Sequence, residues 1–284
     1  MTQAPAPRGP ARAMPPGACD CHFHIYDPRF PYAAGAGLTP PPAPLERYLQ
    51  LRRALGLARG VVVQPSSYGT DNRCTMAAVQ ALGPDAARAV VVLDAAATQA
   101  ELQSLHAGGA RGLRINMLRG ARLDRDALDG LCARVRPLGW HLLLHAPASA
   151  LEDLAPWLHA LRMPVVLDHW ARIDPADVPG RGGHRAACAL LDAGRTWIKL
   201  SAPYLASRHP GPDHEDLAPL AADLLRRAPE RLLWGSDWPH PGCPPHGQPD
   251  DLALFARLCH CLDEAGLLAT VLADNPARLY GFGP

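Results

Sequence analysis

The chain has 284 residues, 48% of them hydrophobic, and a formal net charge of +1. The near-neutral charge gives no indication of a nucleic-acid partner or of binding to an anionic membrane surface. The sequence contains no run of about 18 apolar residues, so no transmembrane helix is expected. Residues 1–17 lack the apolar segment of a secretory signal. We therefore predict a flexible tail over 1–17 and one folded domain over 18–284, with no nucleic-acid or membrane partner.

Eight short apolar segments alternate along the chain with segments of helical periodicity. The predicted strands are 18–25, 60–64, 88–94, 111–116, 140–146, 164–169, 196–202 and 231–237. The predicted helices are 43–56, 71–82, 98–108, 124–137, 149–161, 182–194, 214–228 and 248–266. Strands that are apolar on both faces indicate a parallel sheet, and eight β/α units predict a single (β/α)8 TIM barrel of the α/β class. A doubly wound open sheet is the alternative.

The eight cysteines of the chain form no CxxC pair. A chain of this length does not need disulfide bonds to stabilise its core, so reduced thiols are expected. This indicates a cytoplasmic protein. The sequence favours no particular oligomeric state.

The first predicted strand contains the segment CDCHFH at residues 19–24, in which Asp20, His22 and His24 occupy alternate positions. Alternate residues of a strand point to the same face, so these three side chains are expected on one face. A carboxylate and two imidazoles suit a metal ion or proton transfer better than they suit a core.

Polar side chains also stand at the C-terminal ends of the other predicted strands, where barrel enzymes carry their catalytic groups. They are Arg114 and Asn116, His145, Asp168 and His169, Lys199 and Ser201, and Asp237. Histidines and a carboxylate suit zinc or a similar cation, and either a metal or a carboxylate can activate a water molecule. The alternatives are structural roles, such as a helix cap at Asp237.

The pattern of DxHxH on the first strand, histidines on the fifth and sixth, and aspartate on the eighth resembles the amidohydrolase superfamily. The resemblance extends over residues 18–282 and is closest to the amidohydrolase-2 group of 2-pyrone-4,6-dicarboxylate lactonase and related lactone hydrolases. It is carried by the segments CDCHFHIYDPRFPY, VVVQPSSYGTDN, GGARGLRINML, VVLDHWAR, LLWGSDWPHP and DNPARLYGF.

This resemblance implies a hydrolase that opens a lactone by attack of water. Asp237 matches the general base, and His22, His24 and His169 match the residues that polarise the carbonyl or orient the water. Asp20 can orient one of the histidines. The expected partner is a small-molecule substrate.

The resemblance leaves the cofactor open between none and one divalent metal ion, with zinc the expected ion. A binuclear centre bridged by a lysine on the fourth strand is excluded, because Lys199 is the only lysine and lies on the seventh strand. His145 replaces a tyrosine of the pyrone lactonase. It can complete a metal site made of His22, His24, His145 and Asp237, or it can donate a hydrogen bond to the substrate.

Arg114 matches the arginine of the family that binds a substrate carboxylate, for which a guanidinium is well suited. The expected substrate-binding residues are Arg114, Asn116, His145, Ser67, Tyr68 and Arg119. Leu205 replaces a further arginine of the family, and a tyrosine of the first loop is replaced near Leu38. We therefore expect a lactone with fewer or differently placed carboxylates. The alternative functions are a zinc-dependent decarboxylase of the same superfamily and a non-catalytic binding protein.

Overall fold

A computed structural model describes residues 13–119, 124–209, 213–243 and 247–283, without the side chain of Arg119. Eight parallel strands follow one another around a single sheet in the order β1 to β8. Their bounds are β1 Cys19–Phe23, β2 Arg59–Val63, β3 Ala87–Val91, β4 Ala110–Asn116, β5 His141–His145, β6 Val165–Leu167, β7 Thr196–Ser201 and β8 Leu232–Gly235. The predicted TIM barrel is confirmed.

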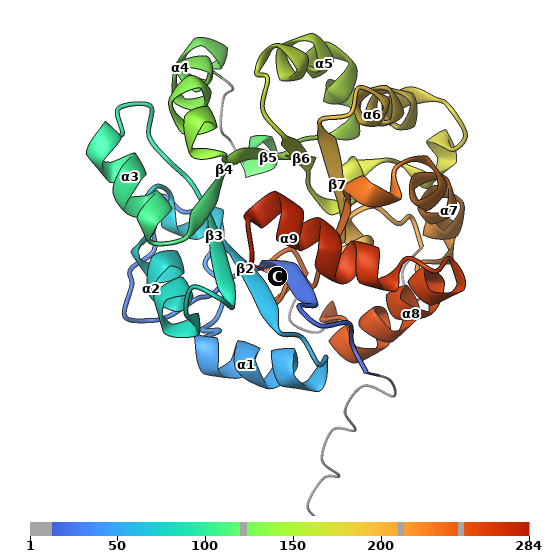
Figure 1. Cartoon of the computed structure of the whole chain (residues 1–284), viewed down its shortest axis with the longest axis horizontal. Helices are drawn as coiled ribbons and strands as arrows, with labels where there is room; N and C mark the ends of the chain where they lie inside the picture. The colour runs from blue at the N-terminus through green and yellow to red at the C-terminus, as the bar shows by residue number, and fades with distance from the viewer. Residues whose placement is uncertain (1–12, 120–123, 210–212, 244–246, 284) are drawn as a thin grey trace, which may run out of the picture.

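Eight α-helices of the described residues form a ring outside the strands (Figure 1). They are α1 Leu45–Ala54, α2 Arg73–Leu82, α3 Gln99–Ala107, α4 Arg125–Val135, α5 Leu151–Ala160, α6 Gly182–Asp192, α7 Ala218–Arg227 and α8 Asp251–Glu264. Each lies within a predicted helix, and several begin at a side-chain cap. At α8, for example, the Asp250 carboxylate accepts the backbone N–H groups of Leu252 and Ala253.

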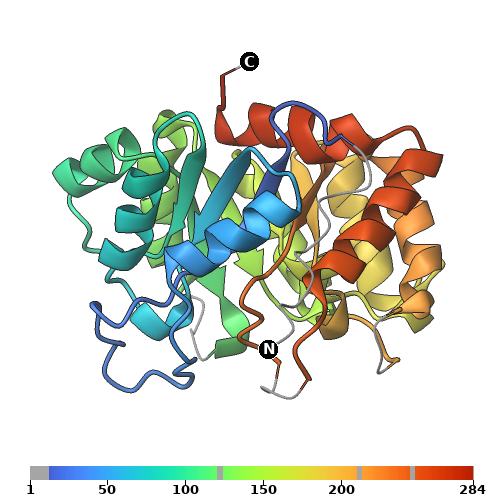
Figure 2. The ribbon, with the colours of Figure 1, turned by 90° about the horizontal axis from the view of Figure 1, so that it is seen from below.

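A ninth helix, α9 Asn275–Tyr280, covers the end of the barrel at which the strands begin (Figure 1). Tyr280 and Phe282 pack with strand residues such as Cys21 and Leu143 in one buried cluster. The long loop after β1 lies at the opposite end, together with the other strand-to-helix loops (Figure 2). The mouth of the barrel is therefore the end where the strands stop, as expected for this fold.

The barrel closes where β1 meets β8. The backbone N–H of Asp237 donates to the carbonyl of His22, and that of His24 donates to the carbonyl of Trp238, both at 2.8 Å. The buried Asp20 carboxylate reinforces this seam. It accepts the backbone N–H and the hydroxyl of Ser236, at 2.9 and 2.6 Å, as well as the Tyr48 hydroxyl at 3.2 Å.

A β-bulge in β1 changes the expected arrangement of CDCHFH. Asp20 pairs with Gly60 and Phe23 with Val62, so β1 has one residue more than β2 between these positions. Asp20 and Phe23 both contact Tyr48 of α1, whereas His22 faces Asp168 and Lys199 inside the barrel. The expectation that Asp20 shares a face with both histidines is wrong, because the extra residue turns His22 inward.

Residues 1–12 of the predicted tail lie outside the described residues, whereas residues 13–17 are described and lead into β1. Met14 already packs against the core. Within the described ranges, no helix is long and apolar enough to cross a membrane.

We predict that Ser236→Ala lowers the free energy of unfolding by about 2 kcal/mol, because it removes a hydrogen bond to a buried charged acceptor. Urea denaturation measures this change. Ser104→Ala, on the exposed face of α3, is the matched control and should change stability little. An equally small effect at Ser236 would contradict the assigned role of the Asp20 seam.

His141, at the start of β5, provides a test of burial. Burial lowers the pKa of His141 to about 3. The ring packs directly against Gly112, where the Cβ of any other residue would lie only 2.4 Å from the ring. The unfolded chain takes up this proton near pH 6.5. Stability from the neutral ring is therefore present above that pH and is lost as the pH falls toward the folded pKa.

We predict that the free energy of unfolding falls more steeply between pH 6 and 4 in the wild type than in His141→Leu. The difference in slope should be about 1.4 kcal/mol per pH unit, which corresponds to one proton. Urea denaturation at several pH values measures both slopes. Equal slopes would show that His141 titrates alike in the folded and unfolded chain.

Candidate active site

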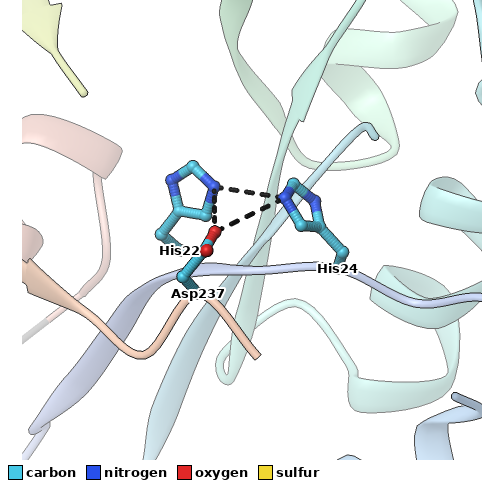
Figure 3. Close-up of side chains that lie close together, drawn as sticks. All are labelled: His22, His24 and Asp237. Atoms are coloured by element: carbon cyan, nitrogen blue, oxygen red, sulfur yellow. Dashed lines mark hydrogen bonds and ion pairs between the residues drawn. The ribbon is translucent and has the colours of Figure 1, made fainter. Parts of the chain in front are cut away.

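Three side chains from the β1–β8 seam meet inside the mouth of the barrel. Nε2 of His22 lies 3.3 Å from Nε2 of His24, and Oδ1 of Asp237 lies 3.4 and 3.7 Å from these two atoms. Figure 3 shows both rings turned with these nitrogens toward the carboxylate. All three residues are buried.

The neighbours of the two rings define which nitrogen carries the proton. Nδ1 of His24 lies 2.7 Å from the carbonyl oxygen of Val63, which can only accept, so Nδ1 donates and Nε2 keeps its lone pair. Nδ1 of His22 lies 3.0 Å from the Asp168 carboxylate, which can only accept, and 3.3 Å from Nζ of Lys199, so the nearer carboxylate favours a proton on Nδ1. Burial lowers the pKa of His24 to about 4, which keeps its ring neutral at neutral pH.

The three atoms fit a divalent cation. Two imidazole lone pairs and a carboxylate oxygen face one another, and this donor set suits zinc. In a tetrahedral zinc site with bonds near 2.0–2.1 Å, neighbouring ligand atoms lie about 3.3 Å apart. The observed separations of 3.3, 3.4 and 3.7 Å are close to this value.

Asp168 and Lys199 lie beside His22, inside the barrel. Nζ of Lys199 lies 3.3 Å from Nδ1 of His22 and 3.9 Å from Asp168, whose other oxygen lies 4.0 Å from Nη2 of Arg114. Burial alone would raise the pKa of Asp168, but His169, His22 and Lys199 outweigh it and hold this pKa well below its usual range. An ionised carboxylate thus orients His22.

The segment after β6 forms a left-handed turn. His169, Trp170, Ala171 and Arg172 all have φ between 48° and 57°, a conformation that costs an L-residue about 1–2 kcal/mol. Residues three apart in such a tight turn share a side, so His169 and Arg172 both line the cavity. Nδ1 of His169 lies 2.9 Å from the Ser201 hydroxyl, and its Nε2 lies 3.9 Å from Asp237.

Asp237 is held from behind by residues of the following loops. The Tyr204 hydroxyl donates to Oδ2 of Asp237 at 2.5 Å, which leaves Oδ1 facing the histidines. The same hydroxyl lies 3.2 Å from Nδ1 of His240, whose Nε2 lies 2.9 Å from Asp251. Asp237 has a φ of 62°, a left-handed conformation that aspartate and asparagine tolerate better than most residues.

A cavity of about 730 Å³ opens above these groups. Arg114, Asn116 and Ser67, all predicted to bind substrate, line it. Arg114 donates to the carbonyl of Gln64 at 2.8 Å, while its buried Nε has no partner within the described ranges. The Ser67 hydroxyl donates to the carbonyl of Leu38 and so holds the loop after β1.

His145 also lines the cavity but does not join the cluster of His22, His24 and Asp237. Potential ligand atoms of those three residues all lie within 4.8 Å of one another, and His145 is not among them. Its ring packs edge-on against His169, with centroids 4.7 Å apart, and neither ring nitrogen has a partner among the described residues. Burial lowers the pKa of His145 to about 2, so the ring is neutral.

Two predicted substrate-binding residues have other outcomes. The prediction for Tyr68 is wrong, because its ring is buried outside the cavity and its hydroxyl bonds to the backbone of Asp27. The side chain of Arg119 lies outside the described part of the chain. Asp20 accepts the backbone N–H of His22, so its contact with a histidine is made through the backbone and not through an imidazole.

Sequence reasoning assigned no role to Asp168, Arg172, Lys199 or Tyr204. Asp168 and Lys199 could have been assigned to the site, because both stand near the C-terminal ends of predicted strands. Arg172 and Tyr204 lie within loops, whose course the sequence does not define.

The barrel carries two imidazoles and a carboxylate at its mouth, which are groups that enzymes use to activate water. A protein-family model described as Amidohydrolase matches residues 19–282. The chain therefore belongs to the amidohydrolase family, as predicted.

Similar proteins are known from several bacteria. The chain is 36% identical to the 4-sulfomuconolactone hydrolase of Rhizobium radiobacter over 275 residues, which cover 95% of this chain and 91% of the relative. It is 35% identical to the 2-pyrone-4,6-dicarboxylate hydrolase of Comamonas testosteroni over 291 residues, with coverage of 96% and 93%. An apo crystal structure from Agrobacterium tumefaciens matches with a TM-score of 0.86 and 32% identity, over 97% of this chain and all of that one.

Proposed function

We propose that this enzyme hydrolyses an anionic lactone with Asp237 as the general base. The observation that carries the proposal is the position of Oδ1 of Asp237 between three histidines on the floor of the cavity. The two relatives named above are hydrolases of a lactone and of a pyrone, which supports this substrate class.

The reaction needs one proton to move twice. Asp237 takes a proton from water as the oxygen attacks the lactone carbonyl, and the carbonyl becomes a tetrahedral oxyanion. When the ring C–O bond breaks, the protonated Asp237 returns that proton to the leaving ring oxygen. The products are a carboxylic acid, which ionises at neutral pH, and a hydroxyl or enol group. The hydrogen bond from Tyr204 keeps the reactive oxygen of Asp237 oriented toward the cavity.

The histidines and arginines divide the remaining tasks. His169, held through Ser201, lies where it can orient the water or polarise the carbonyl. Arg114 and Arg172 line the cavity with buried N–H groups that have no partner in the described residues. Guanidinium groups of this kind bind carboxylates, which supports an anionic substrate.

We further propose that His22, His24 and Asp237 hold one divalent metal ion, most simply zinc. The separations of their ligand atoms support this assignment. Such an ion, when bound, polarises a carbonyl and acidifies a bound water. His145, outside this group, is then left to bind the substrate.

The decarboxylase alternative is not favoured. The relatives named above are hydrolases. Release of CO2 instead of a proton would distinguish the two reactions.

We predict that Asp237→Asn lowers kcat about 10²–10⁴-fold in a proton-release assay on a panel of lactones, because the amide cannot accept the proton. The fold should persist, since asparagine tolerates the same backbone conformation. Asp213→Asn is the matched control, because Asp213 is exposed and pairs only with Arg257 among the described residues. Near-normal turnover by a folded Asp237→Asn would overturn the assignment of the base.

We predict that chelator-treated protein binds one equivalent of Zn²⁺ in isothermal titration calorimetry, and that His24→Gln weakens this binding at least tenfold. His260→Gln is the control, because His260 is exposed on α8. Equal affinity in the wild type and His24→Gln would show that zinc binds elsewhere or not at all.

A further inference from the structure

We propose that the substrate carries its anionic groups on one side of the lactone ring only, and that the opposite side of the ring is apolar. This proposal rests on the lactone hydrolase function proposed above. It follows from a difference in charge and polarity between two opposite sides of the cavity.

Two groups of three strands, here called halves, lie on opposite sides of the mouth of the barrel, and the loop after β2 contributes Ser66 and Ser67 to the cavity between them. Strands β4, β5 and β6 are neighbours, and β7, β8 and β1 are neighbours on the other side, because the order runs from β1 to β8 and closes between β8 and β1. The reactive group Asp237 belongs to the seam of the second half, and His169 to the first. A substrate ring bound over both therefore presents one edge to each half.

The half formed by β4 to β6 is cationic and rich in hydrogen-bond donors. Its cavity-lining residues include Arg114, Asn116, His145 and Arg172. Within the described part of the chain, Arg172 forms no ion pair, and its buried Nη1 has no hydrogen-bond partner. A half-buried guanidinium without an anion loses solvation and gains nothing in return, so this half is built to receive an anionic group.

The loops of the half formed by β7, β8 and β1 line the cavity mainly with apolar groups. Apart from His24, Tyr26 and Asp237, the lining residues of this half are small or aliphatic, namely Ala33, Ala34, Gly35, Ala36, Gly37 and Leu38 after β1, Leu205 after β7, and Pro241 and Gly242 after β8. The segments 210–212 and 244–246, which follow β7 and β8 in the sequence, contain no arginine or lysine.

The arginines in the described loops of this half form ion pairs with aspartates. Arg29 binds Asp27, and its side chain is 78% exposed. Arg208 binds Asp174, and its side chain is 61% exposed. A substrate carboxylate on this side would lose water without gaining a cation, which is unfavourable. An alkyl or unsubstituted ring edge would instead gain by burial.

Two benzoates test this division without requiring turnover. Benzene-1,4-dicarboxylate and 4-methylbenzoate both carry their second group directly opposite the first carboxylate, and they differ only in whether this second group is charged. Isothermal titration calorimetry with the full-length protein should show 4-methylbenzoate binding at least tenfold more tightly. Arg172→Gln should remove at least tenfold of that affinity. Equal or tighter binding of the dicarboxylate, or no binding of either compound at millimolar concentration, overturns the proposal.

A charge placed in the apolar half provides a second test. Leu205→Lys should reverse the preference, so that the dicarboxylate binds at least as tightly as 4-methylbenzoate. Leu252→Lys adds the same charge at an exposed position of α8 and should leave the tenfold preference intact. A folded Leu205→Lys protein with an unchanged preference would overturn the assignment of this half.

The outcomes separate this proposal from the proposed function. Lactone hydrolysis together with a preference for the dicarboxylate overturns only the one-sided arrangement of charge. A tenfold preference for 4-methylbenzoate without hydrolysis of any lactone overturns the lactone as substrate, and with it the proposal made here.

Discussion

The seam between the first and last strands is the constraint on which the rest of the structure depends. A barrel of eight parallel strands has no edge only if β1 and β8 join. Here the join is made by backbone hydrogen bonds of His22, His24, Asp237 and Trp238, and by the buried carboxylate of Asp20. The same residues that close the barrel carry the reactive side chains, so closure and assembly of the site occur together.

The site requires unusual backbone conformations at several positions of the fold. His22 is turned inward by an extra residue in β1, and Asp237 and the residues 169–172 adopt left-handed backbone conformations. Strained backbone persists only where the surrounding structure determines it. A closed barrel with helices around it, and with α9 across the end at which the strands begin, supplies that rigidity.

Electrostatics inside the barrel separate the roles of chemically similar groups. Asp168 remains ionised because cationic and histidine neighbours surround it, while Asp20, bonded to hydroxyls and backbone N–H groups, has its pKa raised by burial to about 6. His24 and His145 stay neutral because burial disfavours their charge. The site therefore offers neutral nitrogens and an oriented carboxylate, which is the state that activation of water requires.

Much of the architecture could be predicted from the sequence. Alternating strand and helix patterns are local, so the eight β/α units and the barrel followed from periodicity alone. The topological rule that strands of a barrel end at one mouth then placed His22, His24, His169 and Asp237 together. Arg114 and Asn116 line the cavity for the same reason.

The remaining features depend on displacements that local sequence does not encode. A one-residue bulge turned the His22 side chain away from the face that carries Asp20, and the hydroxyl of Tyr68 bonds to the backbone of Asp27 outside the cavity. Loops with left-handed turns brought in Arg172 and Tyr204. The sequence by itself determined which residue types reach the mouth of the barrel, because strand periodicity is a property of the backbone. Only the tertiary structure decided which of them touch, because register, bulges and loop paths are set by packing between segments far apart in the chain.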